Sequence, residues 1–440
     1  MDTPILDFVR RYAAGDTARL HMPGHKGRGP LGIEGCDITE VFGADSLYEA
    51  DGIIRKSEEN ASRLFGSRTF YTTEGSSHAI RAMLFLAMKK ARSEGKPLRL
   101  AAARNVHKSF LTATALLDLE TLWLSGGDSY LSCALDLHAV EDCLVKEHPF
   151  ALYITSPDYL GNLQNVAALA ELCHRHGALL LVDNAHGAYL HFLPAPMHPM
   201  DLGADMCCDS AHKTLPALTG AAYLHISHAH QDLRDMAKEA LALFGSTSPS
   251  YLTLASLDAQ NAYLAEDYGR ELSACCEQIE LLKAKLATHG YPLIGEDPMK
   301  ITLVPKPFGY TGGELAAHLR ENGIEPEFAD PDYLVLMPTP ANTREELFRV
   351  REVLCALPRR TPVPEKPPRT PKTVTVLSVR DALFATAERI PTEKSLGRIF
   401  ASLAFSCPPA VPILIAGEEI TEEAIAALLY YGIEEISVVK

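Results

Sequence analysis

The 440-residue sequence contains no C-x-x-C pair, no long apolar run and no block of basic residues. Its ten cysteines are scattered, a usage that predicts neither a disulfide framework nor a zinc ribbon and favours the cytoplasm. No apolar run approaches the ~18 residues of a membrane helix. The N-terminal residues also lack the apolar stretch of a secretory signal. We therefore expect a cytoplasmic protein with no membrane partner.

The charge balance is acidic. Forty-one Lys and Arg residues against 56 Asp and Glu residues leave a formal charge of −15, which argues against a nucleic-acid partner and weakly favours a cationic small substrate. With 47% hydrophobic and 22% charged residues, the composition is that of a globular protein with room for two to three domains.

The hydrophobic pattern alternates between short strands and helices from about residue 68 to 226, which predicts an α/β fold with a parallel or mostly parallel sheet. Ligands bind beyond the carboxyl ends of the strands in such sheets. A β-α-β-β-α pattern follows over 301–356, then a segment with six prolines over 357–372, then a strand-like run over 373–378. The predicted organisation is an arm (1–60), a large domain (61–290), a small α/β domain (291–357), a proline-rich linker (358–372) and a C-terminal module (373–440).

Three segments at predicted strand ends carry reactive side chains. Thr73–His78 runs into a helix with a glycine and two serines, a pattern that suits a phosphate but also an ordinary helix cap. Asp183 ends a very apolar strand, where it needs a partner for its charge or acts as a cap. Lys213 follows another strand among small polar residues, although a lone lysine is usually a solvated surface charge.

Together, the three segments match the needs of pyridoxal phosphate. A lysine forms a Schiff base with the aldehyde, a carboxylate keeps the pyridine nitrogen protonated, and a helix N-terminus with hydroxyl groups holds the phosphate. A neighbouring His212 would help to lower the pKa of the Lys213 amine. We therefore expect this cofactor and a small-molecule substrate.

Four longer motifs support this interpretation. They are HMPGHK (21–26), DITEVFGADSLYEADGII (37–54), SAHKTLPALTG (210–220) and STSPSYLTLASLD (246–258). In this order they resemble the ornithine/lysine/arginine decarboxylase family of pyridoxal phosphate enzymes. The resemblance implies a large domain of the aspartate aminotransferase type (fold type I). It also implies the short form that lacks an N-terminal wing domain, and a homodimer.

The resemblance also implies roles for individual residues. Lys213 would form the Schiff base, Asp183 would partner the pyridine nitrogen, and His107 would stack on the ring. Thr247 and Ser248 match a segment that reaches the phosphate from the partner subunit. The full expected cofactor-binding set is Gly75, Ser76, Ser77, His107, Asp183, Ala185, His186, Ser210, His212, Lys213, Thr247 and Ser248.

The histidine pairs 21/25, 174/176 and 186/191 do not have the spacing and third ligand of a known zinc pattern, so no catalytic metal is expected.

The choice of reaction depends on how the substrate is held. Aminotransferases of this fold clamp the α-carboxylate with an arginine after a small-domain strand, but Tyr333–Pro340 contains none. This favours decarboxylation of lysine, arginine or ornithine. The alternatives are another enzyme with this cofactor, such as an aminotransferase or a lyase, or a weakened binding or regulatory paralogue.

The C-terminal module departs from the family. Where members commonly read GRISAE and PYPPGIP, this chain has Ser402 for the acid, Cys407 for the tyrosine and Ala410 for the glycine. Glu74 likewise replaces a frequent asparagine in the phosphate segment. These departures predict an altered substrate or weakened activity.

Overall fold

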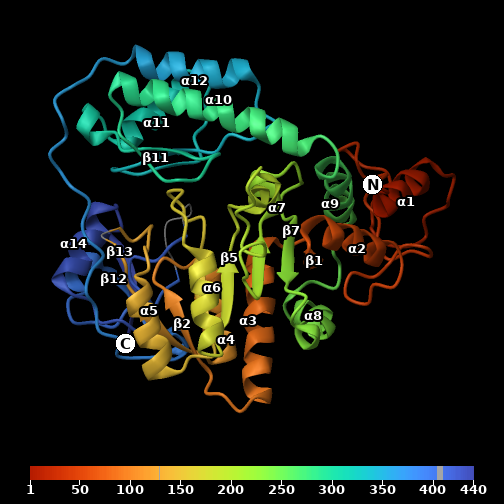
Figure 1. The fold of residues 1–440 in the computed structure, drawn as a ribbon, viewed down its shortest axis with the longest axis horizontal. Coiled ribbons are helices and arrows are strands. Elements are labelled where there is room, and N and C mark those ends of the chain that lie inside the picture. Colours follow the sequence, from red (N-terminus) through yellow and green to blue (C-terminus); the bar gives the residue numbers. More distant parts are fainter. Residues whose placement is uncertain (128, 404–409) are drawn as a thin grey trace. The chain divides into compact units, whose positions relative to one another are not determined.

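The computed structural model describes residues 1–127, 129–403 and 410–440, and Figure 1 labels many of its helices and strands. The contacts divide the chain into two units. The first comprises Met1–Leu98, His148–Ile154 and Asn165–Glu271, and the second comprises Arg99–Glu147, Thr155–Gln164 and Leu272–Lys440. The fold is α/β with a large, mostly parallel sheet, as the alternating pattern predicts.

Five strands of the first unit lie in the order β1-β7-β6-β5-β4. They are β1 (Arg68–Thr72), β4 (Ala151–Thr155), β5 (Leu179–Asp183), β6 (Met206–Asp209) and β7 (Ala222–Ile226). Strands β5 and β6 are parallel, with Asp183 opposite Cys208, whereas β7 is antiparallel to both β1 and β6. Strands β1, β5 and β6 therefore point the same way, and their carboxyl ends share one edge of the sheet.

The helices of the first unit include α3, which begins at Gly75 directly after β1 and packs against β6, β7 and α8. Its N-terminus therefore lies at the edge where β1, β5 and β6 end. The helices are α1 (Pro4–Ala14), α2 (Ile53–Phe65), α3 (Gly75–Ser93), α6 (Val166–Arg175), η1 (Ala188–Phe192), α7 (Ala211–Thr214), α8 (Gln231–Phe244) and α9 (Tyr251–Leu264). The structure describes all of residues 15–52 and places no helix or strand among them.

The second unit contains the parallel pair β2 (Arg99–Ala103) and β3 (Glu120–Leu124), with α4 (Lys108–Leu117) between them and α5 (Leu137–Glu147) after them. An antiparallel sheet follows, in the order β10-β11-β9-β8. Its strands and helices are α10 (Tyr268–His289), β8 (Leu293–Ile294), β9 (Ile301–Leu303), η2 (Lys306–Phe308), α11 (Gly312–Glu321), β10 (Phe328–Ala329), β11 (Leu334–Leu336) and α12 (Arg344–Ala356). Helices α11 and α12 start with capping boxes, Thr311 with Glu314 and Thr343 with Glu346, which satisfy the first free amides of each helix.

The C-terminal module closes the second unit. It contains α13 (Val379–Phe384), β12 (Ala387–Pro391), η3 (Thr392–Lys394), α14 (Glu422–Tyr430) and β13 (Glu435–Val439), with β12 antiparallel to β13. Buried Phe400, Leu414, Ile420, Leu428 and Val438 form its core.

The prediction of a strand over 373–378 was wrong. This segment forms only an isolated bridge between Thr375 and Glu418, and Val374 and Val376 are exposed. Alternating β-branched residues form a strand only where a neighbouring strand pairs with them.

Among the described residues, none of the helices has the length and apolar character to cross a bilayer.

Candidate active site

The three reactive segments of the first unit meet at the shared edge of its sheet. Ser210 Oγ, after β6, donates a hydrogen bond to Ser76 Oγ at the start of α3, at 2.8 Å. The Gly75 amide donates to the Gly220 carbonyl oxygen at 2.8 Å. The structure thus links the predicted phosphate segment directly to the segment that carries Lys213.

Gly75 forms the first turn of α3 in a left-handed conformation, with φ +71°, which glycine adopts without strain. A Cβ at this position would lie 4.0 Å from His212 Cε1, so the glycine borders the His212 ring. Ser76 is buried and Ser77 is half-buried in the same turn. Amides and hydroxyls at the start of a helix are the donors that an anionic group needs.

His212 lies between the helix start and Lys213. Its Nδ1 donates to the Ala221 carbonyl oxygen at 2.9 Å. Burial lowers the pKa of the ring despite that hydrogen bond. The lowered pKa favours the neutral ring at pH 7, and the hydrogen bond to Ala221 places its proton on Nδ1.

Lys213 Nζ lies 3.0 Å from His186 Nε2. Lys213 comes from α7, and His186 from the turn that follows β5. A lysine with a histidine nitrogen at hydrogen-bond distance has a partner that can take up or return its proton.

Asp183 is 2% exposed at the end of β5. It accepts hydrogen bonds from the Ala185 amide at 3.2 Å, the Tyr153 hydroxyl at 3.3 Å and the Cys208 thiol at 3.7 Å. Burial raises the pKa of this carboxyl group, while the charge of Lys213 opposes that rise. Since these three donors are all neutral, the carboxylate is suited to a cationic N–H group.

Glu74, Thr247 and Ser248 lie together at the same edge. Glu74 Oε1 accepts a hydrogen bond from the Ser246 amide at 2.6 Å. Glu74, which stands where the family frequently has asparagine, therefore holds the 246–248 segment beside the start of α3. Thr247 and Ser248 are exposed.

Several predicted residues belong to the second unit. His107 caps α4, where its Nδ1 accepts hydrogen bonds from the amide and hydroxyl of Ser109, at 3.2 and 2.9 Å. Its predicted stacking on a cofactor ring stays a prediction.

The C-terminal departures also lie in the second unit. Ser402 is half-buried, and Cys407 lies outside the described residues. Ala410 has φ +58°, and its carbonyl oxygen accepts the Lys108 amide at 3.0 Å.

A second group of polar residues in the first unit escaped the sequence analysis. The Oδ2 atom of buried Asp209 lies 3.0 Å from His198 Nε2 and 3.1 Å from His225 Nε2, and Asp209 Oδ1 accepts from Asn184 Nδ2 at 2.6 Å. Burial favours a higher pKa for Asp209, but the two histidines outweigh it and hold the pKa well below its usual range. The visible signals were a histidine inside an apolar strand, at position 225, and an acid after another, at position 209.

Asp209, His198 and His225, together with Cys207, form a set of four potential metal ligands. However, His198 Nδ1 accepts a hydrogen bond from the Met200 amide at 3.3 Å. The proton of a neutral His198 is therefore on Nε2, which donates to Asp209. To bind a metal through Nε2, His198 would have to carry its proton on Nδ1, where that proton would point at the N–H group of Met200. Hydrogen bonds therefore account for the cluster without a metal ion.

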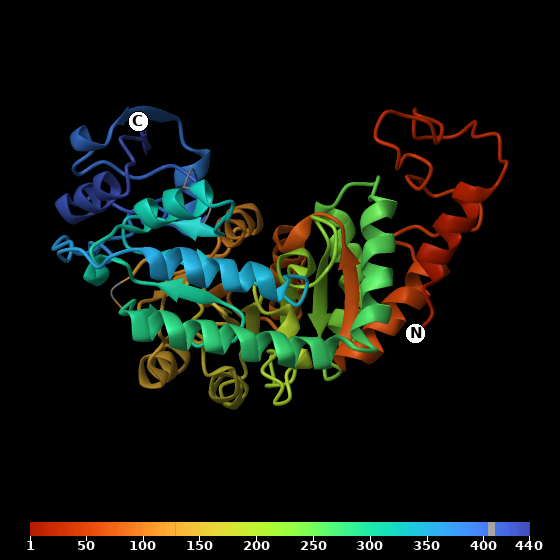
Figure 2. The ribbon, with the colours of Figure 1, turned by 90° about the horizontal axis from the view of Figure 1, so that it is seen from above.

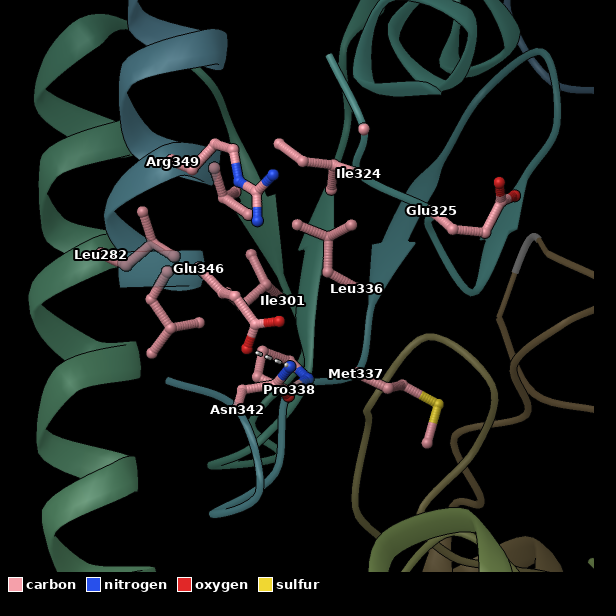
Figure 3. Close-up of a pocket in the computed structure, with 13 residues that line it drawn as sticks. Leu282, Ile301, Ile324, Glu325, Leu336, Met337, Pro338, Asn342, Glu346 and Arg349 are labelled. Carbon is pink, nitrogen blue, oxygen red and sulfur yellow. Dashed lines mark hydrogen bonds between the residues drawn. The ribbon is translucent and has the colours of Figure 1, made fainter. Parts of the chain in front are cut away.

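A further pocket lies in the small domain of the second unit (Figure 3). Ile301, Leu336 and Met337 contribute apolar walls, and Arg349 reaches over them from α12. None of the predicted site residues lines it. Its arginine comes from a helix rather than from the Tyr333–Pro340 segment.

Comparisons with known proteins point to one family. A family model described as "Orn/Lys/Arg decarboxylase, major domain" matches residues 32–291. A protein named arginine decarboxylase from Halalkalibacterium halodurans is 31% identical, and the match covers 96% of this chain and 92% of that protein. Its namesake from Bacillus subtilis is 29% identical, with 97% of this chain and 92% of that protein covered.

Solved structures show the same fold. The lysine decarboxylase of Francisella novicida matches with a TM-score of 0.82 at 18% identity, over 100% of this chain and 81% of that one. The constitutive lysine decarboxylase of Escherichia coli matches with a TM-score of 0.79 at 18% identity, over 100% and 82%. At this identity, the likeness concerns the fold alone.

Proposed function

The chain belongs to the Orn/Lys/Arg decarboxylase family, and we propose that it uses pyridoxal phosphate, on a fold-type-I scaffold, to decarboxylate lysine, arginine or ornithine to the amine and CO₂. One observation carries the proposal: Lys213, the buried Asp183 and the glycine–serine start of α3 meet at one edge of the first unit's sheet. Relatives matched over 92% of their length are named arginine decarboxylase, so arginine is the first substrate to test.

The donor set of the first unit fits the cofactor. A buried carboxylate whose donors are neutral has room for a cationic ring N–H group, since such a charge offsets the cost of burying the acid. The amide of Ser76 and the hydroxyls of Ser76 and Ser77 suit a phosphate. Lys213 supplies the amine that an aldehyde requires.

When bound, pyridoxal phosphate supplies an electron-accepting ring that stabilises the electron pair left behind when CO₂ departs. Lys213 would hold the cofactor through its Nζ atom, and His186, 3.0 Å away, would take up the proton that the amine must lose. Asp183 would keep a proton on the ring nitrogen. Ser210 would orient the Ser76 hydroxyl through their hydrogen bond. After CO₂ has left, Lys213 or a nearby histidine would return a proton to Cα.

Two features support decarboxylation rather than transamination. Tyr333–Pro340 has no arginine to clamp the α-carboxylate, and a carboxylate that departs as CO₂ gains from a less polar setting. The named relatives are decarboxylases.

The proposed enzyme is a homodimer. Residues 15–52 of the arm carry fully or largely exposed apolar side chains, among them Leu20 at 94%, Leu31 at 76% and Phe42 at 105%, and Figure 2 shows this segment projecting beyond helices α1 and α2. Apolar groups in such a segment gain by burial against another chain. Thr247 and Ser248 are likewise exposed and would contact the phosphate of the partner's site.

The test is to incubate the cofactor-loaded protein with lysine, arginine and ornithine separately and to measure CO₂ and amine, with Lys213→Ala as the control. We expect one of the three to be turned over by the wild type and none by the variant. Keto-acid formation without CO₂ would indicate an aminotransferase, and no turnover of any of the three would refute the proposed substrate class. Light scattering after size exclusion tests the dimer.

A further inference from the structure

The hydroxyl of Thr72 and the ring of His78 form a buried hydrogen bond next to the start of α3. Thr72 is the last residue of β1 and is 0% exposed, and His78 lies in the first turn of α3 and is 1% exposed. Thr72 Oγ1 lies 2.6 Å from His78 Nδ1. The chain between them contains Gly75, Ser76 and Ser77, which were assigned above to the cofactor phosphate. The hydrogen bond therefore closes the loop that carries the proposed phosphate donors.

The direction of this hydrogen bond follows from the other ring nitrogen of His78. Nε2 lies 2.7 Å from the Leu241 carbonyl oxygen, which can only accept, so Nε2 carries a proton. Burial lowers the pKa of the ring, although the hydrogen bond to Leu241 and the charge of Glu74 oppose this effect, and the neutral ring is favoured at pH 7. Nδ1 then has no proton and accepts from the hydroxyl of Thr72.

The side chain of Thr72 also holds the backbone of the phosphate segment. Its Oγ1, whose own proton is engaged by the histidine ring, accepts a hydrogen bond from the Glu74 amide at 3.2 Å. The next amide, that of Gly75, donates to the Gly220 carbonyl oxygen at 2.8 Å. Two consecutive amides are thus fixed immediately before Ser76. The direction of the Ser76 amide is therefore set by contacts that do not involve a ligand.

The His78 ring is itself confined by its neighbours. A Cβ at Gly245 would lie 2.6 Å from His78 Cε1 and would overlap the hydroxyl of Tyr48, so a glycine is needed where the chain after α8 passes the ring. The rings of Tyr48 and His78 meet edge to face, with centroids 6.4 Å apart. Because the ring cannot turn without losing its bond to Leu241, Nδ1 presents a fixed acceptor to Thr72.

We propose that Thr72 and His78 are positioning residues for the cofactor phosphate, because their hydrogen bond holds the turn before Ser76 in the conformation that binds it. This inference rests on the proposed use of pyridoxal phosphate and adds two residues that the expected cofactor-binding set does not contain. Donors that are already oriented bind an anion more tightly, since less conformational freedom is lost on binding. Loss of this buried hydrogen bond should weaken phosphate binding about tenfold.

The test compares two ligands that differ only in the phosphate group. Equilibrium dialysis of the full-length, cofactor-free protein gives the Kd of pyridoxal phosphate and of pyridoxal, and the ratio of the two Kd values reports what the phosphate contributes. Thr72→Val replaces the hydroxyl with a methyl group of similar size. It should raise the Kd of pyridoxal phosphate about tenfold and change that of pyridoxal less than about twofold. Thr72→Ser keeps the hydroxyl and should keep the wild-type ratio within about twofold.

Thr69→Val is the matched control. Thr69 is also buried on β1, and its Oγ1 lies 2.9 Å from His225 Nδ1, so the variant removes the same kind of hydrogen bond at the other end of the strand. It should leave the ratio of the two Kd values unchanged. Melting temperatures of all variants show that they are folded.

His78→Leu removes the acceptor instead of the donor and should cause the same selective loss as Thr72→Val. The double variant should lose no more than either single variant, because both changes break one hydrogen bond.

The inference is overturned if Thr72→Val keeps the wild-type ratio, if Thr72→Ser loses as much as Thr72→Val, or if Thr69→Val lowers the ratio equally. A wild-type protein that binds pyridoxal phosphate no more tightly than pyridoxal would overturn the phosphate assignment of the proposed function, and the inference with it. The two failures are therefore distinguished by whether the wild type or only the variants depart from expectation.

Discussion

The amine of Lys213 and Nε2 of His186 lie 3.0 Å apart. They come from segments that follow different strands, β6 and β5, so the parallel pairing of these strands sets their distance. The histidine is thereby a direct proton partner of the proposed nucleophile.

Replacing His186 with alanine should therefore slow turnover about 100-fold, the usual contribution of one positioned acid or base. The rate at which added cofactor becomes covalently attached to Lys213, trapped by borohydride and read by mass spectrometry, should fall as well. His228→Ala, which changes an exposed histidine of the same unit, is the control and should leave both rates unchanged. Unchanged attachment in His186→Ala would remove His186 from the mechanism.

Asp183→Asn keeps the shape of the side chain and removes its charge. Turnover should fall about 100- to 1000-fold, because an amide cannot hold a proton on the ring nitrogen. The cofactor-free variant should nevertheless fold, since it no longer buries a carboxylate.

The pH dependence of stability has a defined sign at this residue. Burial raises the pKa of Asp183 in the folded protein, so the folded state binds the proton more tightly than the unfolded chain. The cost of the buried charge therefore grows as the pH rises from the unfolded pKa of 3.8 to the higher folded pKa, and it is absent below 3.8. Melting temperatures of cofactor-free wild type and Asp183→Asn should converge as the pH falls. A gap that widens toward low pH would contradict the shift.

Asp209→Ala should lower the free energy of unfolding by about 3–5 kcal/mol, because it removes the acceptor that His198, His225 and Asn184 share in a fully buried setting. Denaturation with urea measures this loss. Exposed Asp235→Ala, on α8, is a control that should cost little.

The same cluster predicts the effect of chelators. Since protons occupy the positions that a metal would take, dialysis against EDTA should leave the melting temperature unchanged, and added Zn²⁺ should not raise it. A fall in melting temperature with EDTA that Zn²⁺ reverses would show that the tautomer assignment is wrong.

Ala410→Gly should raise the free energy of unfolding by about 0.5–1 kcal/mol. Ala410 has φ +58°, a left-handed conformation that is less favourable for alanine than for glycine. Glycine also raises the conformational entropy of the unfolded chain, which offsets part of this gain in stability. Ala410→Val should lower stability, because a β-branched residue tolerates this conformation less well. Urea denaturation of both variants checks the order.

Much of the fold could be predicted from local patterns. The unbroken apolar run Leu179–Val182 indicated a strand covered on both faces, and β5 is buried throughout. The glycine and serines after Thr73 indicated a helix start, and α3 begins at Gly75. These features depend on neighbouring residues in the chain, which the sequence displays directly.

Other features depend on partners that are distant in the chain. Hydrophobic alternation could not reveal that β7 runs against both of its neighbours, nor that the run over 373–378 finds no strand to pair with among the described residues. The Asp209 cluster was equally invisible, and so was the Asn105 amide, which has no hydrogen-bond partner among the described residues, because hydrogen bonding in the interior is decided by which segments pack together.

The sequence by itself thus determined most of the order of strands and helices, although not over 373–378, as well as the family and the reactive residues at the strand ends. Only the tertiary structure decided which of those residues meet: Ser210 with Ser76, and Lys213 with His186. The physical reason is that periodicity and capping act over a few residues, whereas sheet order and side-chain packing join atoms that lie far apart in the chain.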